Sequence, residues 1–120
     1  MHLAGLLGDA AVRQLYGKIL LDVGNYESAR EVFLRGAKER PNATLWCGAG
    51  VASLRLGEVE AAELALSEAN LYDNDNAEVW GYLALVCTKL KRQQEAEASF
   101  RTAIGLGSFI RVSLLFFCQT

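Results

Sequence analysis

The sequence predicts an all-α protein, and three observations support this fold class. The 120 residues include a single proline, Pro41, and 52% of them are hydrophobic against 22% charged, so the chain can fill a core. This composition is typical of helices and not of the short strands and Gly/Pro-rich turns of a β-sandwich. The strongest observation is an internal repeat, because Trp46 recurs as Trp80 and Ala62 recurs as Ala96, each 34 residues later. One antiparallel helix pair fills such a period.

The repeat divides the chain into three units of two helices each, at residues 10–42, 43–76 and 77–107. We expect helices near residues 10–23, 26–39, 43–56, 59–72, 77–90 and 93–106. The first, third and fifth helices each carry a small residue, which is Gly17, Gly50 or Ala84. A small residue there lets a bulky side chain of the neighbouring helix pack closely. The other three helices supply that side chain in a shared small–large–small pattern: Ala29, Phe33 and Gly36; Ala62, Leu66 and Ala69; Ala96, Phe100 and Ala103.

The helix ends have their own signals. Asp9, Asn25, Asn42 and Asn76 each precede a helical run, and their side chains can accept hydrogen bonds from the first free N–H groups. Each unit then ends on a residue that stops a helix or begins a turn. These residues are Pro41, Asn74 and Ser108.

The spacing resembles the tetratricopeptide pattern W-x2-L-G-x2-Y, then A-x3-F, then P, over about residues 10–107. This resemblance implies a right-handed superhelix of three antiparallel helix pairs. Two residues depart from the pattern: Arg13 stands where the other units have Trp, and Lys91 stands where Gly24 and Gly57 make the turn. The outer units therefore match the family less well than the middle one.

Three stretches, 34–41, 43–58 and 65–80, also resemble the C-terminal repeats of cilia- and flagella-associated tetratricopeptide proteins. That resemblance implies a scaffold in the axoneme of motile cilia or flagella, with axonemal proteins among its partners. Such a scaffold binds other proteins and catalyses no reaction. It also implies that the chain is a fragment or short form of a longer protein.

The first helix of each pair lines the concave side of a helical solenoid, where such proteins bind extended or helical segments. We call the residues that the periodicity places there the concave groove, and we expect them to form the binding site for a partner protein. They are largely apolar, which favours an apolar helix or another repeat as the ligand. The concave groove comprises Gln14, Lys18, Leu21, Thr44, Cys47, Val51, Leu54, Glu78, Gly81, Tyr82 and Leu85.

The alternative function is a cochaperone-like adaptor. One tetratricopeptide subclass clamps the C-terminal carboxylates of its partner with Lys, Asn and Arg on this face. The resemblance puts Gln14, Lys18, Gly48, Glu78 and Tyr82 at the matching places, and only Lys18 is basic. Glu78 would repel an acidic peptide, so the adaptor remains the second hypothesis. Two further possibilities stay open: part of the groove is covered by the same chain, or the chain associates with itself.

Other function classes find little support. The net charge of -2 gives no positive field for nucleic acid. The single histidine, His2, lies outside the repeats, so no catalytic triad can be built and we expect neither enzymatic activity nor a cofactor. Cys47, Cys87 and Cys118 lack the spacing of a zinc site, and no metal is expected. We expect Cys87 in the core, and Cys47 as a small apolar contact of the groove rather than a reactive thiol.

The two ends stand apart from the repeats. Residues 1–9 form a short lead-in without the features of a secretory signal, so we expect a cytoplasmic protein. Residues 108–120 form an atypical apolar tail whose one charge is Arg111, and this tail is too short to span a membrane. We therefore expect no membrane partner. As a hypothesis, Phe109, Val112 and Phe116 dock on the helix that contains Phe100 and cap the solenoid.

Overall fold

The computed structural model describes the backbone of residues 2–107 and the side chains of residues 8–107. The proposed cap of Phe109, Val112 and Phe116, and the third cysteine, Cys118, lie outside these residues. The described part is helical throughout apart from its turns, with no strand, which confirms the all-α prediction. The helices are α1 (His2–Asp22), α2 (Tyr26–Glu39), α3 (Ala43–Arg55), α4 (Val59–Tyr72), α5 (Ala77–Lys89) and α6 (Gln93–Leu106).

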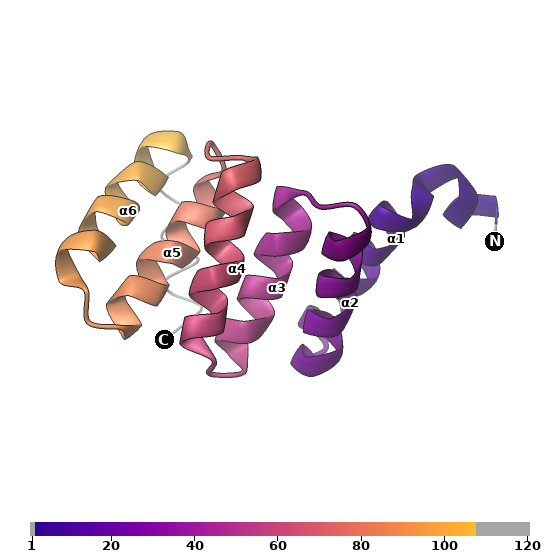
Figure 1. The fold of residues 1–120 in the computed structure, drawn as a ribbon, viewed down its shortest axis with the longest axis horizontal. Coiled ribbons are helices and arrows are strands. Elements are labelled where there is room, and N and C mark those ends of the chain that lie inside the picture. The colour runs from indigo at the N-terminus through magenta and orange to yellow at the C-terminus, as the bar shows by residue number, and fades with distance from the viewer. Residues whose placement is uncertain (1, 108–120) are drawn as a thin grey trace.

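The helices stack side by side in chain order (Figure 1). The hairpins α1–α2, α3–α4 and α5–α6 each pack internally, and α2 then packs on α3 and α4 on α5. The result is an elongated body with extents of 47 × 26 × 24 Å. Because each unit contacts only its neighbours, local features of one unit act on that unit and the next.

Five of the six helices begin and end within one residue of their predicted bounds. The exception is α1, which starts at His2 and not near residue 10. Gly8 interrupts it with a φ of 81° and a ψ of 160°, so a short helical segment precedes the part of α1 that belongs to the first repeat. A positive φ is readily available to glycine, which explains why the break falls at this residue.

The turns within the three hairpins share one geometry. Gly24 and Gly57 have positive φ values of 84° and 82°, and Lys91 takes the same left-handed conformation at 62°. After each turn residue, a backbone N–H bonds back to the preceding helix: Asn25 N to Leu20 O, Glu58 N to Ser53 O and Arg92 N to Cys87 O. The third hairpin therefore has the same turn as the other two, although Lys91 stands where they have glycine. The left-handed conformation of Lys91 costs about 1 kcal/mol.

Side-chain caps are found at the starts of α3 and α5. Asn42 accepts from Leu45 N at 2.8 Å, and Asn76 accepts from Glu78 N at 2.9 Å, as predicted. Asn25 was predicted as a cap but makes no capping side-chain bond. Its φ of -89° and ψ of 73° follow directly from the left-handed turn at Gly24, and the turn's backbone bonds fix this helix start instead. Asp9 directly follows the break at Gly8, where the repeat part of α1 begins, but it likewise makes no capping side-chain bond among the described residues.

The ring of Phe33 joins three helices. It extends from α2 and is 1% exposed. A Cβ atom added to Gly17 of α1 would lie 2.5 Å from Phe33 Cζ, and one added to Gly48 of α3 would lie 2.4 Å from Phe33 Cε1. The ring therefore fills the space that two absent side chains leave. In the second unit Leu66 lies in the same way against Gly50, where an added Cβ would come within 2.7 Å of its Cγ.

Replacing Gly48 with alanine tests this packing. We expect Gly48→Ala to lower the free energy of unfolding by about 1–3 kcal/mol, because the added methyl group overlaps the buried ring. Gly105→Ala in α6 is the matched control, since a Cβ there meets nothing within 4 Å. That change should stabilise the chain by about 0.5 kcal/mol. Urea denaturation followed by circular dichroism measures both; equal effects of the two substitutions would contradict the packing described for Phe33.

Candidate functional site

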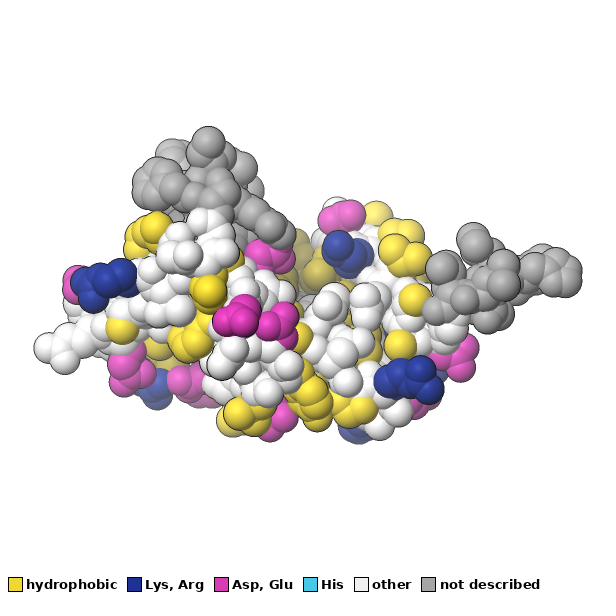
Figure 2. All heavy atoms as spheres, turned by 90° about the horizontal axis from the view of Figure 1, so that it is seen from above, with side chains coloured by type: hydrophobic (Ala, Val, Ile, Leu, Met, Phe, Trp, Pro, Cys, Tyr) yellow, Lys and Arg dark blue, Asp and Glu magenta, His cyan; other side chains and the backbone are white. Residues whose placement is uncertain are grey.

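A pocket of about 360 Å³ opens on the side formed by the first helices of the three units. Residues of α1, α3 and α5 make up most of its wall, and Phe33 of α2 and Asn76 complete it. Figure 2 shows that the surface is hollowed between the two ends of the molecule, with hydrophobic side chains in and around the hollow. We call this feature the concave pocket. Its lining consists of Lys18, Leu21, Phe33, Thr44, Cys47, Gly48, Val51, Asn76, Glu78 and Tyr82.

Many residues of the predicted concave groove meet in this pocket. Those that line it are Lys18, Leu21, Thr44, Cys47, Val51, Glu78 and Tyr82. They come together because equivalent positions recur on the three first helices, 33 residues apart between the first two units and 34 between the second and third. Whether they bind a partner remains a prediction.

Four other predicted groove residues lie outside the lining. Gln14 is half-buried, and its Oε1 accepts a hydrogen bond from Asn42 Nδ2 at 3.0 Å, so it joins α1 to the start of α3. Leu54 and Leu85 are 7% and 9% exposed and belong to the core cluster around Leu66. Gly81 is buried as well.

The sequence prediction missed two contributors to the pocket, Phe33 and Asn76. Phe33 was expected to pack as the large residue of its helix, but its ring passes between Gly17 and Gly48 and reaches the pocket. The sequence did hold a signal for this position of the ring. Gly48 is an extra glycine in the third helix, two residues before Gly50 of the repeat pattern, and it marks a second place where a large side chain can pack closely. Asn76 was predicted only as a helix cap. It caps α5 as predicted, and it also lines the pocket.

Opposite charges stand on the two outer walls of the pocket. Lys18 comes from α1 and Glu78 from α5, while the floor between them consists of Cys47, Gly48 and Val51 of α3. The ring of Phe33 occupies the side-chain space of Gly48, so this ring forms the floor together with Cys47 and Val51. This arrangement suits a ligand that offers an apolar group between two polar ends.

The thiol of Cys47 is buried beneath this pocket. Burial, and secondarily the negative charge of Glu78, raises its pKa to about 12. The pKa of Cys87, in the core, is raised too, first by burial and then by Glu95 and Glu63. Both thiols are therefore protonated near neutral pH, where a nucleophile or a metal ligand would need the thiolate.

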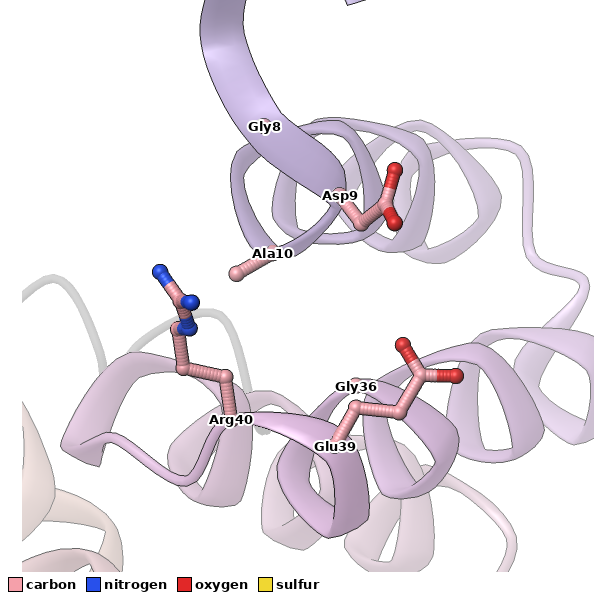
Figure 3. A pocket seen from close by; sticks show the side chains of 6 residues that line it. All are labelled: Gly8, Asp9, Ala10, Gly36, Glu39 and Arg40. Atoms are coloured by element: carbon pink, nitrogen blue, oxygen red, sulfur yellow. The ribbon is translucent and has the colours of Figure 1, made fainter. Parts of the chain in front are cut away.

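A second pocket lies at the N-terminal end, between the start of the repeat part of α1 and the end of α2. It has a volume of about 310 Å³ and is lined by Gly8, Asp9, Ala10, Gly36, Glu39 and Arg40. Figure 3 shows the carboxylates of Asp9 and Glu39 on one side and the guanidinium of Arg40 on the other. Glu39 is already engaged, because its Oε1 accepts from Arg13 Nη2 at 3.0 Å. The concave pocket therefore remains the candidate site.

Among the described residues, no group of three or more His, Cys, Asp or Glu side chains could hold a metal ion. None of the helices described is both long and apolar enough to cross a membrane.

Comparison with known proteins identifies the family. The family model described as the cilia and flagella-associated protein 70 C-terminal domain matches residues 9–108. The chain belongs to this family. Cilia- and flagella-associated protein 70 from Macaca fascicularis and from Homo sapiens are each 48% identical to the chain over 90 residues, or 75% of it. The chain spans 9% and 8% of the length of these relatives. Both resemblances seen in the sequence are confirmed.

Solved structures of tetratricopeptide domains share the fold. The second such domain of Spaghetti (RPAP3), bound to the HSP90 peptide SRMEEVD, has a TM-score of 0.81 and 25% identity, covering 89% of this chain and 100% of that one. The Arabidopsis OM64 domain has a TM-score of 0.79 and 26% identity, with 82% and 85% of the chains covered. Tetratricopeptide folds are typical of scaffolds that do not catalyse reactions.

The buried position of Cys47 predicts slow modification by a thiol reagent. In a Cys118→Ser variant at pH 8, we expect Cys47 to react with Ellman's reagent at least about 100-fold more slowly in the folded chain than in urea. The raised pKa also predicts that stability falls as pH rises from about 9 toward 12, because the unfolded chain releases this proton first. Rapid labelling of the folded protein, located by peptide mass spectrometry, would show that Cys47 is accessible.

Proposed function

We propose that this domain is a protein-binding scaffold module that holds a segment of another protein in the concave pocket. The observation that supports this most is that α1, α3 and α5 all contribute to one pocket. A ligand seated there contacts all three repeats at once. Such a ligand also stabilises the stacking of the repeats, since it binds only when they are in place.

The proposed ligand is a helix or an extended segment with an apolar side chain at its centre. Leu21, Val51 and Tyr82 offer apolar wall, and the ring of Phe33, which fills the side-chain space at Gly48, adds an apolar surface to the floor. Lys18 and Glu78, on opposite walls, suit a segment with an acidic group at one end and a basic group at the other.

We place the proposed scaffold in the axoneme of cilia or flagella, with axonemal components as partners. Membership of the cilia and flagella-associated protein 70 family supports this location. The relatives are more than ten times longer than the matched region, so the domain supplies one binding surface among others of the whole protein.

The second candidate function is an adaptor for acidic C-terminal peptides. Two observations favour it: the RPAP3 domains share the fold while bound to peptides of HSP90 and HSP70, and Lys18 lines the pocket of this chain. One observation opposes it, because Glu78 would repel the carboxylates of such a peptide. We therefore favour the scaffold.

Proximity labelling in ciliated cells tests the scaffold and its location. We expect the chain to label axonemal proteins, and Val51→Glu to remove these neighbours, because a carboxylate in the apolar pocket must be desolvated when the ligand binds. Leu64→Glu is the matched control, since Leu64 is 72% exposed on α4, away from the concave pocket. A purely cytosolic set of neighbours, or the same set from Val51→Glu and the unchanged chain, would contradict the proposal.

Titration with the peptide SRMEEVD separates the two candidates. We expect isothermal titration calorimetry to detect no saturable binding below about 100 µM, because one lysine faces several carboxylates and Glu78. Glu78→Lys should increase the affinity at least about tenfold by replacing repulsion with attraction. Micromolar binding by the unchanged chain, lost in Lys18→Ala, would instead support the adaptor.

A further inference from the structure

The convex side of the solenoid, which the second helices of the units form, carries an apolar pocket of about 750 Å³. It lies between α2 and α4, which face the viewer in Figure 1, and α3 forms its floor. The proposed function does not use this feature, which we call the convex pocket. Its main lining residues are Leu34 of α2, Trp46 and Ala49 of α3, and Leu64, Ala65 and Glu68 of α4.

Small side chains of the middle unit leave this pocket open. Ala49 lies at its floor, and the equivalent positions of the first and third units carry the larger Tyr16 and Leu83. In the wall formed by α4, Ala65 stands where α2 has Val32. The pocket beside Tyr16 and Val32 in the first unit is smaller, at about 310 Å³. The size of the hollow is therefore a feature of the middle unit.

Exposed leucines continue the apolar surface beside this pocket. Leu64 is 72% exposed at its rim, and Leu71 is 80% exposed two helical turns further along α4, about 10 Å away on the same side. The repeat fold needs no large apolar residue at either position, because the other two units carry charged or small residues there. These equivalents are Glu31 and Lys38 in α2, and Ala98 and Gly105 in α6. The two leucines therefore suit a contact with another protein.

The convex pocket also carries a carboxylate without a partner. Glu68 is half-buried in the pocket wall, and within the described part of the chain no hydrogen bond or ion pair engages it. The cation on the opposite wall, Arg30, is already paired with Glu58. Along its length α4 has three glutamates and no lysine or arginine. A basic group of a ligand therefore complements this wall.

The floor of the pocket holds a side chain that can adjust to a ligand. Trp46 is equivalent to Trp80, whose Nε1 donates to Asn74 O at 2.7 Å. The Nε1 of Trp46 is buried and has no acceptor among the described residues. Packing alone therefore holds the Trp46 ring, so it can shift when a side chain enters the pocket and bring its N–H to an acceptor.

We propose that the convex pocket binds a basic amphipathic helix of a partner protein. An aliphatic side chain of this helix fills the space between Trp46 and Leu64. A second one, two turns along, packs beside Leu71, because helices that lie side by side repeat their contacts at the same spacing. A lysine or arginine between the two pairs with Glu68. The domain then holds partner segments on two opposite sides.

A peptide of about 18 residues, with leucines on one helical face and lysines on the other, tests this proposal in the full chain. We expect heteronuclear NMR titration to shift the Trp46 indole N–H and the amides of Leu64 and Glu68, with a Kd of about 100 µM. Glu68→Lys should weaken the binding at least about fivefold, because repulsion replaces the ion pair. Glu60→Lys is the matched control, since it makes the same charge change at an exposed residue of α4 outside the pocket lining. It should change the affinity less than about twofold.

Several results would overturn the proposal. No saturable shift at the convex pocket, equal losses in Glu68→Lys and Glu60→Lys, or equal binding of a peptide with glutamates in place of its lysines would each do so. Shifts of the Trp46 signal that follow protein concentration without peptide would assign the pocket to a second copy of the chain. The same shifts caused by Arg111→Ser without peptide would assign it to residues 108–120. Thermal unfolding verifies that Glu68→Lys folds, as expected for a side chain that has no ion partner.

The outcome is separable from that of the proposed function, because the convex pocket and the concave pocket share no lining residue. Leu64→Glu alters the convex pocket alone. It should therefore keep the axonemal neighbours that Val51→Glu removes, and it remains the control for that variant. A failed peptide titration would contradict the convex site and leave the concave one standing.

Discussion

The packing of Phe33 against two glycines is the contact on which the stacking of the first two units depends. Its ring lies where the side chains of Gly17 and Gly48 would be, so α2 approaches α1 and α3 closely at the same level. Close approach on both sides brings the first helices of neighbouring units together, and their exposed sides form the concave pocket. The same ring is part of the pocket wall. One side chain therefore both joins the first two units and borders the candidate site.

Much of the fold could be predicted from the sequence, because the repeat supplies several independent signals at one period. Trp46 and Trp80 show how the repeat units align, and Gly24 and Gly57 mark the turns between helices. From these signals, the ends of five helices were predicted to within one residue. The errors fall where the repeat gives no information. The start of α1 lies ahead of the first unit, and the capping role expected of Asn25 is replaced by the backbone bonds of the turn at Gly24.

The pocket could be predicted in part, for a related reason. Helical periodicity identifies which residues share one side of a helix, so it found Lys18, Val51 and Glu78 on the three first helices. It does not show how deep a side chain lies. Leu54 and Leu85 were placed in the groove by their phase, yet they pack into the core. Phe33 lies in the core as predicted, and periodicity did not show that its ring also borders the pocket.

The third hairpin turn carries a free-energy penalty that the other two avoid, because Lys91 holds a left-handed conformation there without being glycine. In a one-dimensional stack, such a penalty is not shared among distant units. A penalty of about 1 kcal/mol makes detachment of α6 from α5 about fivefold more frequent than a glycine turn would. Local unfolding of this protein would accordingly start more readily at its C-terminal hairpin, while the middle hairpin, enclosed on both sides, stays closed.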